Sequence, residues 1–326
     1  MTRLAVLSLL VVASLGPGVV PPRSATVDSV EPFTLGVLRR DGMVLPFTAF
    51  DGSNWTVPWP EDLKQIEVPI SLGDVPKRWW GKAGSAPEWS VWSNGVPRGS
   101  VRIDRVQAFR LMCATRIGLR TDYKPSETAP PPFEQPYPKD GLVVSGPQAV
   151  EPLTSLPKTP KEWADLTEKL PKFFDDAELR ALRRFTNWSP PFNHTTRLRT
   201  AIEIEAVYRA PMDKPGWTAY YLEAVKNYPV LPVDKGCGLV TSASGWLRVD
   251  PKGTPHFDVE ADVTYCDRKN VGYMLPLGLV KTGNRTHWVY QISGYEREYY
   301  VVTHPDPKAI EIEAEYQAGF CRPTLR

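Results

Sequence analysis

The amino-acid sequence predicts a mainly β protein, made of antiparallel β-sandwich or barrel modules with a short helical insertion. Three observations support this class. Short β-branched and aromatic runs separated by Asp-Gly, Asn-Gly and Pro fill residues 31–122, and strands alternate with turn residues at intervals of about ten over residues 197–322. Helical spacing of apolar residues is confined to residues 162–190.

The N-terminus has the order of a secretory signal peptide, which we place at residues 1–25. Basic Arg3 is followed by an apolar run from Leu4 to Leu15 and then by Gly16-Pro17-Gly18. The run is shorter than the roughly 20 residues of a membrane span, which disfavours the alternative of an uncleaved anchor. We therefore expect a secreted or periplasmic protein with no membrane span in the mature chain.

Residues 31–122 predict a Trp-rich β domain. Asp41-Gly42 stands between two apolar runs, and this dipeptide favours a tight hairpin because both turn positions prefer positive φ. Six of the 11 tryptophans lie between Trp55 and Trp92.

The middle of the chain predicts an extended connector and then helix. Residues 123–161 are dense in proline, which removes backbone donors and fixes φ repeatedly; only residues 141–145 within them predict a strand. Beyond this connector, Leu166 and Leu170, and then Leu179 and Leu182, recur at helical spacing. Residues 162–190 therefore predict two short amphipathic helices.

Residues 197–322 predict a C-terminal antiparallel β domain. Apolar and charged residues alternate over residues 197–209, as in a strand with one buried and one wet face. Residues 201–208 recur in nearly the same form as residues 309–316. Duplication of a module explains this repeat, and so does independent selection of an amphipathic strand.

Charge and motifs exclude several classes of function. With 39 basic and 37 acidic residues, the chain offers no electrostatic reason to expect nucleic acid as a partner. It lacks the nucleophile elbow, the zinc-protease helix, the phosphate loop, the dinucleotide fingerprint and the C-x-x-C pair. We predict no cofactor and no metal. The pairs His256 with Asp258 and His304 with Asp306 offer two metal ligands each, fewer than a zinc site uses.

The four cysteines, in an exported chain, predict disulfides. Three pairings are open. We favour Cys237 with Cys266, which flank a predicted hairpin, and Cys113 with Cys321, which ties the first half of the chain to its end. The alternative of a Cys237 thiol activated by His256 requires a reduced cysteine.

Trp55, Trp59, Trp79 and Trp80 are the candidate ligand-binding residues. They lie among prolines, glycines and basic residues that suggest loops, and exposed indole rings offer flat surfaces on which sugar rings stack. The alternative is that these rings form the core, the commoner place for large aromatic residues.

Asp258 and Glu260 are the candidate catalytic residues. They alternate with apolar residues on a predicted strand, so their side chains share a face with that of Asp262. Crowded carboxylates can act as an acid–base pair on a glycosidic bond. The alternative is a solvated sheet face balanced by basic residues on the neighbouring strand.

Together these observations predict an exported, non-enzymatic binding or structural protein of the cell envelope or extracellular space. Its expected partner is carbohydrate or another cell-envelope component. The alternative is a secreted hydrolase that acts on polysaccharide through paired carboxylates.

Overall fold

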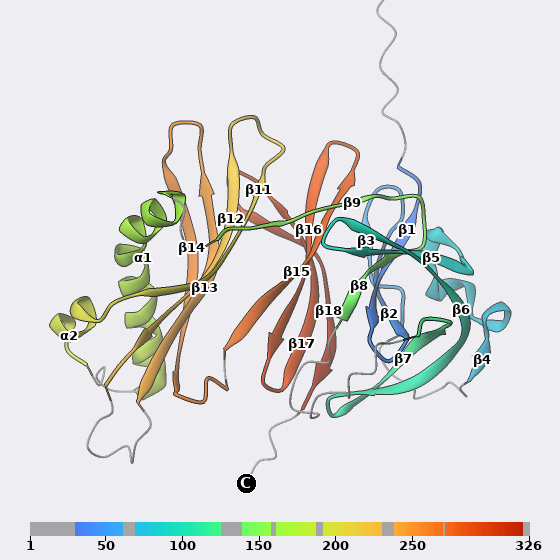
Figure 1. Ribbon diagram of the computed structural model, residues 1–326, viewed down its shortest axis with the longest axis horizontal. Coiled ribbons are helices and arrows are strands. Elements are labelled where there is room, and N and C mark those ends of the chain that lie inside the picture. The colour runs from blue at the N-terminus through green and yellow to red at the C-terminus, as the bar shows by residue number, and fades with distance from the viewer. Residues whose placement is uncertain are drawn as a thin grey trace, which may run out of the picture.

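The computed structural model describes residues 30–60, 69–124, 139–157, 161–186, 192–229, 238–269 and 271–321. Its elements form successive layers: helix, sheet, sheet and barrel (Figure 1). The fold is mainly β and antiparallel, as the sequence predicts. The predicted signal peptide lies outside the described residues, and no described helix is long and apolar enough to cross a membrane.

A closed barrel forms the first layer of the chain, at the right of Figure 1. Its strands run in the order β1-β8-β5-β6-β7-β2, and β1 pairs with β2 to close the ring. Their bounds are β1 Phe33–Arg39, β2 Met43–Phe50, β5 Glu88–Ser93, β6 Val96–Leu111, β7 Ala114–Thr121 and β8 Lys139–Val144. Beside them lie β3 Trp55–Thr56, β4 Ile70–Ser71 and the 3₁₀ turns Leu72–Asp74, Lys77–Trp79 and Gly81–Ala83.

The predicted hairpin at Asp41-Gly42 joins β1 to β2. Gly42 has φ +80°, and a Cβ added there would lie 2.9 Å from the carbonyl oxygen of Tyr123. Asp41 Oδ1 accepts the backbone N–H of Met43 at 3.1 Å, which closes the turn. The sequence pattern therefore predicts the position of the turn, whereas Gly42 alone has the positive φ that was expected of both residues.

Two five-stranded antiparallel sheets stack against each other beside the barrel. We call β10-β11-β12-β13-β14 the helix-side sheet and β18-β17-β16-β15-β9 the central sheet. The helix-side strands are β10 Thr154–Ser155, β11 Glu203–Pro211, β12 Thr218–Asn227, β13 Leu239–Val249 and β14 Pro255–Tyr265. The central strands are β9 Val150–Glu151, β15 Gly272–Thr282, β16 Arg285–Gly294, β17 Arg297–Pro305 and β18 Ile310–Phe320.

Distinct apolar cores hold the layers together. Trp246 and Trp288 meet between the two sheets, with ring centroids 4.7 Å apart. Phe47 of the barrel packs on Tyr300 of the central sheet, with centroids 5.2 Å apart. Because each face of the central sheet is covered, its inner strands β16 and β17 are mostly buried on both sides, which places much of the hydrophobic stabilisation at the centre of the molecule.

The helical segment is one continuous helix, α1 Lys161–Thr186, rather than the two short helices predicted from sequence. It includes Pro171, which is exposed and has no N–H to donate to the preceding turn. Leu166, Leu170 and Phe174 form one buried stripe against the helix-side sheet. Burial of this stripe across the proline offsets the lost hydrogen bond, which explains why the helix continues.

The segment expected as the first strand of the C-terminal domain begins as a short helix. This is α2 His194–Arg199, capped by Asn193, whose Oδ1 accepts the N–H of Thr196 at 2.8 Å. β11 follows, and its register against β12 shifts between Ile204 and Ala206. The bulge changes the predicted alternation, so Val207 joins Ile204 in the core beneath α1.

The described part of the predicted connector forms strands that pair within the barrel and the two sheets. Its predicted strand at residues 141–145 is β8, which pairs with β1 and β5 inside the barrel. β9 then extends the central sheet, and β10 extends the helix-side sheet. The connector therefore contributes a strand to all three β layers.

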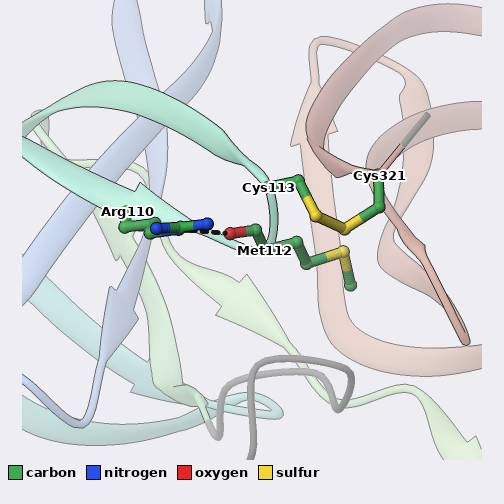
Figure 2. Close-up of a disulfide and its surroundings, with 4 residues drawn as sticks. All are labelled: Arg110, Met112, Cys113 and Cys321. Atoms are coloured by element: carbon green, nitrogen blue, oxygen red, sulfur yellow. Dashed lines mark hydrogen bonds between the residues drawn. A yellow bond between two sulfur atoms is a disulfide. The ribbon is translucent and has the colours of Figure 1, made fainter. Parts of the chain in front are cut away.

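The predicted Cys113–Cys321 disulfide is confirmed and joins the barrel to the central sheet (Figure 2). Cys113 lies between β6 and β7, and Cys321 follows β18. Cys266 is also disulfide-bonded; Cys237 lies outside the described residues, so its pairing with Cys266 stays a prediction. Figure 2 also shows Arg110 Nε donating to the Met112 carbonyl at 3.1 Å, which holds the backbone beside Cys113.

A buried ion pair supports the same junction. Lys139 Nζ of β8 lies 3.0 Å from Glu298 Oε2 of β17, and both side chains are almost fully buried. Arg116 Nε of β7 donates to the Ala318 carbonyl of β18 at 2.6 Å. These contacts, with the disulfide, fix the barrel against the central sheet.

Candidate ligand-binding site

The candidate site is a pocket of about 250 Å³ between the two sheets, which we call the acidic pocket. Four carboxylates contribute to its wall, from β11, β12 and β14: Glu205, Glu223, Glu260 and Asp262. The remaining lining residues are Tyr221, Ala224, Val225, Ser242, Ala243, Ser244, Val271, Gly272, Tyr273, Ile292 and Arg297. Concave sites with converging polar groups are the usual location of ligand binding.

Cross-strand register builds this pocket. Glu223 of β12 pairs with Ser244 of β13, which pairs with Glu260 of β14. One step along, Ser242 pairs with Asp262. Directly paired residues project from the same face of a sheet, so the carboxylates flank a central row of small hydroxyl side chains. These small side chains leave the hollow that the acidic groups surround.

Glu223 is the buried acid of the pocket. Its side chain is 6% exposed, and Oε1 accepts the backbone N–H of Met274 from β15 at 2.5 Å. Burial raises the pKa of Glu223 to about 7, against the lowering effect of the Met274 hydrogen bond and with a smaller raising effect from Glu205. Glu223 therefore exchanges a proton near neutral pH.

Glu205 is compensated by a basic neighbour. Its Oε1 lies 2.7 Å from Arg268 Nη1, and the same guanidinium nitrogen contacts Tyr273 Oη at 3.4 Å. These two contacts raise the pKa of Arg268 above its ordinary value. Arg268 therefore remains a cation that neutralises Glu205 at one end of the pocket.

Glu260 and Asp262 remain uncompensated on the exposed part of β14. Neither side chain makes a hydrogen bond or ion pair with the described residues, and both residues are exposed. Beside them, Ser242 is 7% exposed, and its Oγ has no hydrogen-bond partner within the part of the chain that the structure describes. The pocket therefore presents negative charge together with an unsatisfied hydroxyl.

The two carboxylates predicted as catalytic take different positions. Asp258 and Glu260 share the solvent-facing side of β14, as expected, since Val259 between them is buried. Glu260 lines the acidic pocket, whereas Asp258 pairs in register with Trp246 and lies outside the lining. Asp258 therefore does not join the carboxylates around Ser242 and Ser244.

The four tryptophans predicted as ligand contacts are buried. Trp59, Trp79 and Trp80 pack together in the barrel, and Trp59 Nε1 donates to the Ile117 carbonyl at 2.9 Å. Trp55 is 9% exposed and packs between the barrel and the central sheet, where it lines a second pocket. This arrangement favours the core-packing alternative, and sugar stacking on these rings stays a prediction.

The predicted histidine pairs do not gather metal ligands. His256 stacks on Trp217, with ring centroids 5.5 Å apart, and His304 Nδ1 lies 3.2 Å from the Thr286 carbonyl oxygen. Among the described residues, no three His, Cys, Asp or Glu side chains are grouped as a metal site. The predicted thiol nucleophile, Cys237, lies outside those residues.

Sequence reasoning identified Glu260 and missed Glu223, Glu205 and Ser242. A signal for Glu223 exists: it is the only acidic residue in the otherwise apolar run Tyr220-Tyr221-Leu222-Glu223-Ala224-Val225. A charge within a buried strand requires a partner, a proton or a function. The small residues Ser242, Ala243, Ser244 and Gly245 at the middle of one strand are a second signal, because they fill little space.

No protein-family model, curated protein sequence or solved structure matches this chain.

Proposed function

We propose that this protein is an exported binding protein that holds a small, amine-bearing ligand in the acidic pocket. Among carbohydrates, an amino sugar has this chemistry. The observation that carries the proposal is the pair of uncompensated carboxylates, Glu260 and Asp262, beside the buried acid Glu223 and the unpaired Ser242 hydroxyl. Export is supported by the N-terminal sequence pattern and by the disulfides.

Charge complementarity argues for a cationic group in the ligand. Glu205 is paired with Arg268, and Arg297 also lies in the lining, so the two carboxylates of β14 leave the pocket with an excess of negative charge that an ammonium can meet. Such an ion pair is weak on an open surface and stronger where water is partly excluded, as beside Glu223. A sugar carrying an amine adds hydroxyls for Ser242 and Ser244. The pocket volume of about 250 Å³ suits a ligand smaller than most drugs.

A specific geometry supports hydrolysis as the second candidate function. Glu223 and Glu260 stand two strands apart on one face, with Ser244 between them. Two such steps separate their Cα atoms by roughly 10 Å. Inverting glycosidases hold their two carboxyl groups, which extend beyond the Cα atoms, roughly 6.5–9.5 Å apart, and one of the two has a raised pKa. Burial gives Glu223 the raised pKa of a general acid, and Glu260, exposed in the same lining, is the candidate base.

Calorimetric titration with glucosamine at pH 6.5 tests the binding proposal. Wild type is expected to bind glucosamine and not its neutral N-acetyl form, and E260Q/D262N is expected to lose at least about tenfold in affinity. D258N is the matched control, because Asp258 lies on the same strand and face but outside the pocket. An equal loss of glucosamine affinity in D258N and in E260Q/D262N would show that the acidic pocket is not the binding site.

The same protein preparation separates binding from hydrolysis. Incubation with chitosan oligosaccharides, followed by a count of new reducing ends, reports cleavage directly. A binding protein leaves the number of ends constant. Release of ends by wild type but not by E223Q or E260Q would establish the hydrolase instead.

A further inference from the structure

Glu223 is buried in the wall of the acidic pocket without a basic side chain bonded to it. It is 6% exposed, and its carboxyl makes one hydrogen bond with the described residues, in which Oε1 accepts the Met274 N–H at 2.5 Å. An ionised carboxylate that is buried without a basic partner is costly, so such a group usually takes up a proton. The geometry therefore indicates that Glu223 is the neutral acid when no ligand is bound.

The titratable groups around Glu223 do not compensate it. Burial raises its pKa to about 7, the Met274 hydrogen bond opposes this rise and Glu205 adds to it, whereas none of the described basic side chains lowers the pKa. Strands β13 and β16 contribute no titratable group to this wall. The titratable and charged groups that face Glu223 or line the pocket with it are Glu205 and Tyr208 of β11, Tyr221 of β12, Glu260 and Asp262 of β14, Arg268 beyond β14, Tyr273 of β15 and Arg297 of β17.

The second carboxyl oxygen of Glu223, Oε2, is the atom that a ligand meets. It makes no hydrogen bond with the described residues, and it retains solvent-accessible surface, unlike the fully buried Oγ of Ser242. Glu223 lines the pocket together with Glu260 and Asp262, so this accessible oxygen belongs to the wall that a cation approaches. A positive charge within about 4–6 Å of a carboxylate lowers its pKa by about 1–3. A cation in this pocket therefore favours the ionised form of Glu223.

We infer that binding of the ligand's ammonium in the acidic pocket expels the proton of Glu223, which then serves as the third carboxylate that balances the ligand. The proton passes from the Glu223 carboxyl to the solvent, and no other covalent bond forms or breaks. This inference rests on the proposed function, because it requires an amine in the pocket. Its consequence is that the protein binds the amine at neutral pH and releases it in acid.

Calorimetric titration with glucosamine at pH 6.5 in two buffers measures the number of protons released. Phosphate and ACES differ in ionisation enthalpy and neither is a net cation, so the difference between the two binding enthalpies reports the protons that the buffer takes up. Wild type is expected to release about 0.5–0.8 proton per glucosamine, because most Glu223 carries a proton at this pH and little does once a cation lowers its pKa. D258N, in which the substituted carboxylate lies outside the pocket, is the matched control and should release the same number.

E223Q provides a second measurement, a pH profile that a purely structural role of Glu223 would not produce. Glutamine reproduces the protonated side chain at every pH, so the proton that wild type releases should be absent from E223Q. The ratio of wild-type to E223Q affinity should grow roughly tenfold from pH 5 to pH 7, because only wild type gains a negative charge at this position over that interval. Both proteins contain Glu260 and Asp262 and bind the same amine, so the titration of these groups cancels in the ratio.

Proton release by wild type and D258N, together with its loss in E223Q, supports the inference. Glucosamine that binds without proton release, or that releases as many protons from E223Q, overturns the inference and leaves the proposed function standing. Wild type that binds no glucosamine contradicts the proposed function, and the inference falls with it. The proton count of wild type does not depend on any variant, so it decides the inference even where E223Q folds poorly.

Discussion

Glu223→Gln is the substitution whose effect the structure specifies most closely. Glu223 is buried, accepts the Met274 N–H and has a pKa raised to about 7 from its ordinary 4.5. Glutamine keeps the shape and the acceptor oxygen but carries no charge at any pH. It therefore reproduces the protonated form of Glu223 and removes the cost of ionising this buried group.

The sign of the pH dependence follows from proton uptake. Between pH 4.5 and pH 7 the folded protein holds a proton on Glu223 that the unfolded chain has lost, so the free energy of unfolding falls as pH rises through this window. The full shift is worth about 3 kcal/mol, of which about 2.5 kcal/mol appears between pH 5 and pH 8. From pH 5 to pH 8, the free energy of unfolding of E223Q should therefore rise relative to that of wild type by about 2.5 kcal/mol.

Urea unfolding of wild type and E223Q at pH 5 and pH 8 measures this quantity. We compare the free energies of unfolding of the two proteins because protonation of His287 changes stability with pH in the direction opposite to that of Glu223. Both proteins contain His287, so its contribution cancels in the difference. E260Q, at an exposed carboxylate of the same pocket, is the control and should show no such trend. If the difference in free energy of unfolding between wild type and E223Q is the same at pH 5 and pH 8, the assignment of Glu223 as a buried acid is refuted.

Three further predictions concern stability. C113S/C321S should lose about 3–5 kcal/mol, because that disulfide closes a loop with a sequence separation of 208; calorimetric melting of the double variant against wild type measures this loss, and reduced wild type should melt lower still, because reduction also opens the disulfide of Cys266. The stability of H287Q should be less sensitive to acid than that of wild type. The pKa of His287 is about 4 in the folded protein and 6.5 in the unfolded chain, so the free energy of unfolding of wild type falls by up to about 3 kcal/mol as pH falls through that window. Urea unfolding of both proteins at pH 6.5 and pH 4.5 compares the two losses. P171A should increase the free energy of unfolding by about 1–3 kcal/mol and so raise the melting temperature, because it restores a backbone N–H donor on the exposed side of α1. An unchanged or lower melting temperature would contradict the account of that helix.

Local patterns predicted the parts of the fold that local chemistry determines. The Asp41-Gly42 turn depends on the positive φ of Gly42 and on the side-chain acceptor of Asp41, and the acidic face of β14 depends on its own alternation. The continuity of α1 through Pro171 depends instead on a sheet formed by residues far along the chain. Its helix propensity alone predicted a break, and tertiary packing decided otherwise.

The candidate site was partly predictable for the same reason. Glu260 was visible because it belongs to a regular acidic face. Glu223 acquires its role from register with Ser244 and from the Met274 N–H, which comes from the other sheet. The polar and proline-rich neighbours of the tryptophans suggested loops, and Trp59, Trp79 and Trp80 fold inward from this segment to pack on one another, which is the core-packing alternative. Long-range pairing of this kind leaves no local pattern in the sequence.

The position of a bound amine tests the central claim most directly. A crystal structure of the protein soaked with glucosamine is expected to place the sugar between the two sheets, with its nitrogen within about 4 Å of the Glu260 or Asp262 carboxylate. Its hydroxyls should lie beside Ser242 and Ser244. A sugar bound elsewhere, or a nitrogen directed away from β14 into solvent, would contradict the assignment of the acidic pocket as the ligand site.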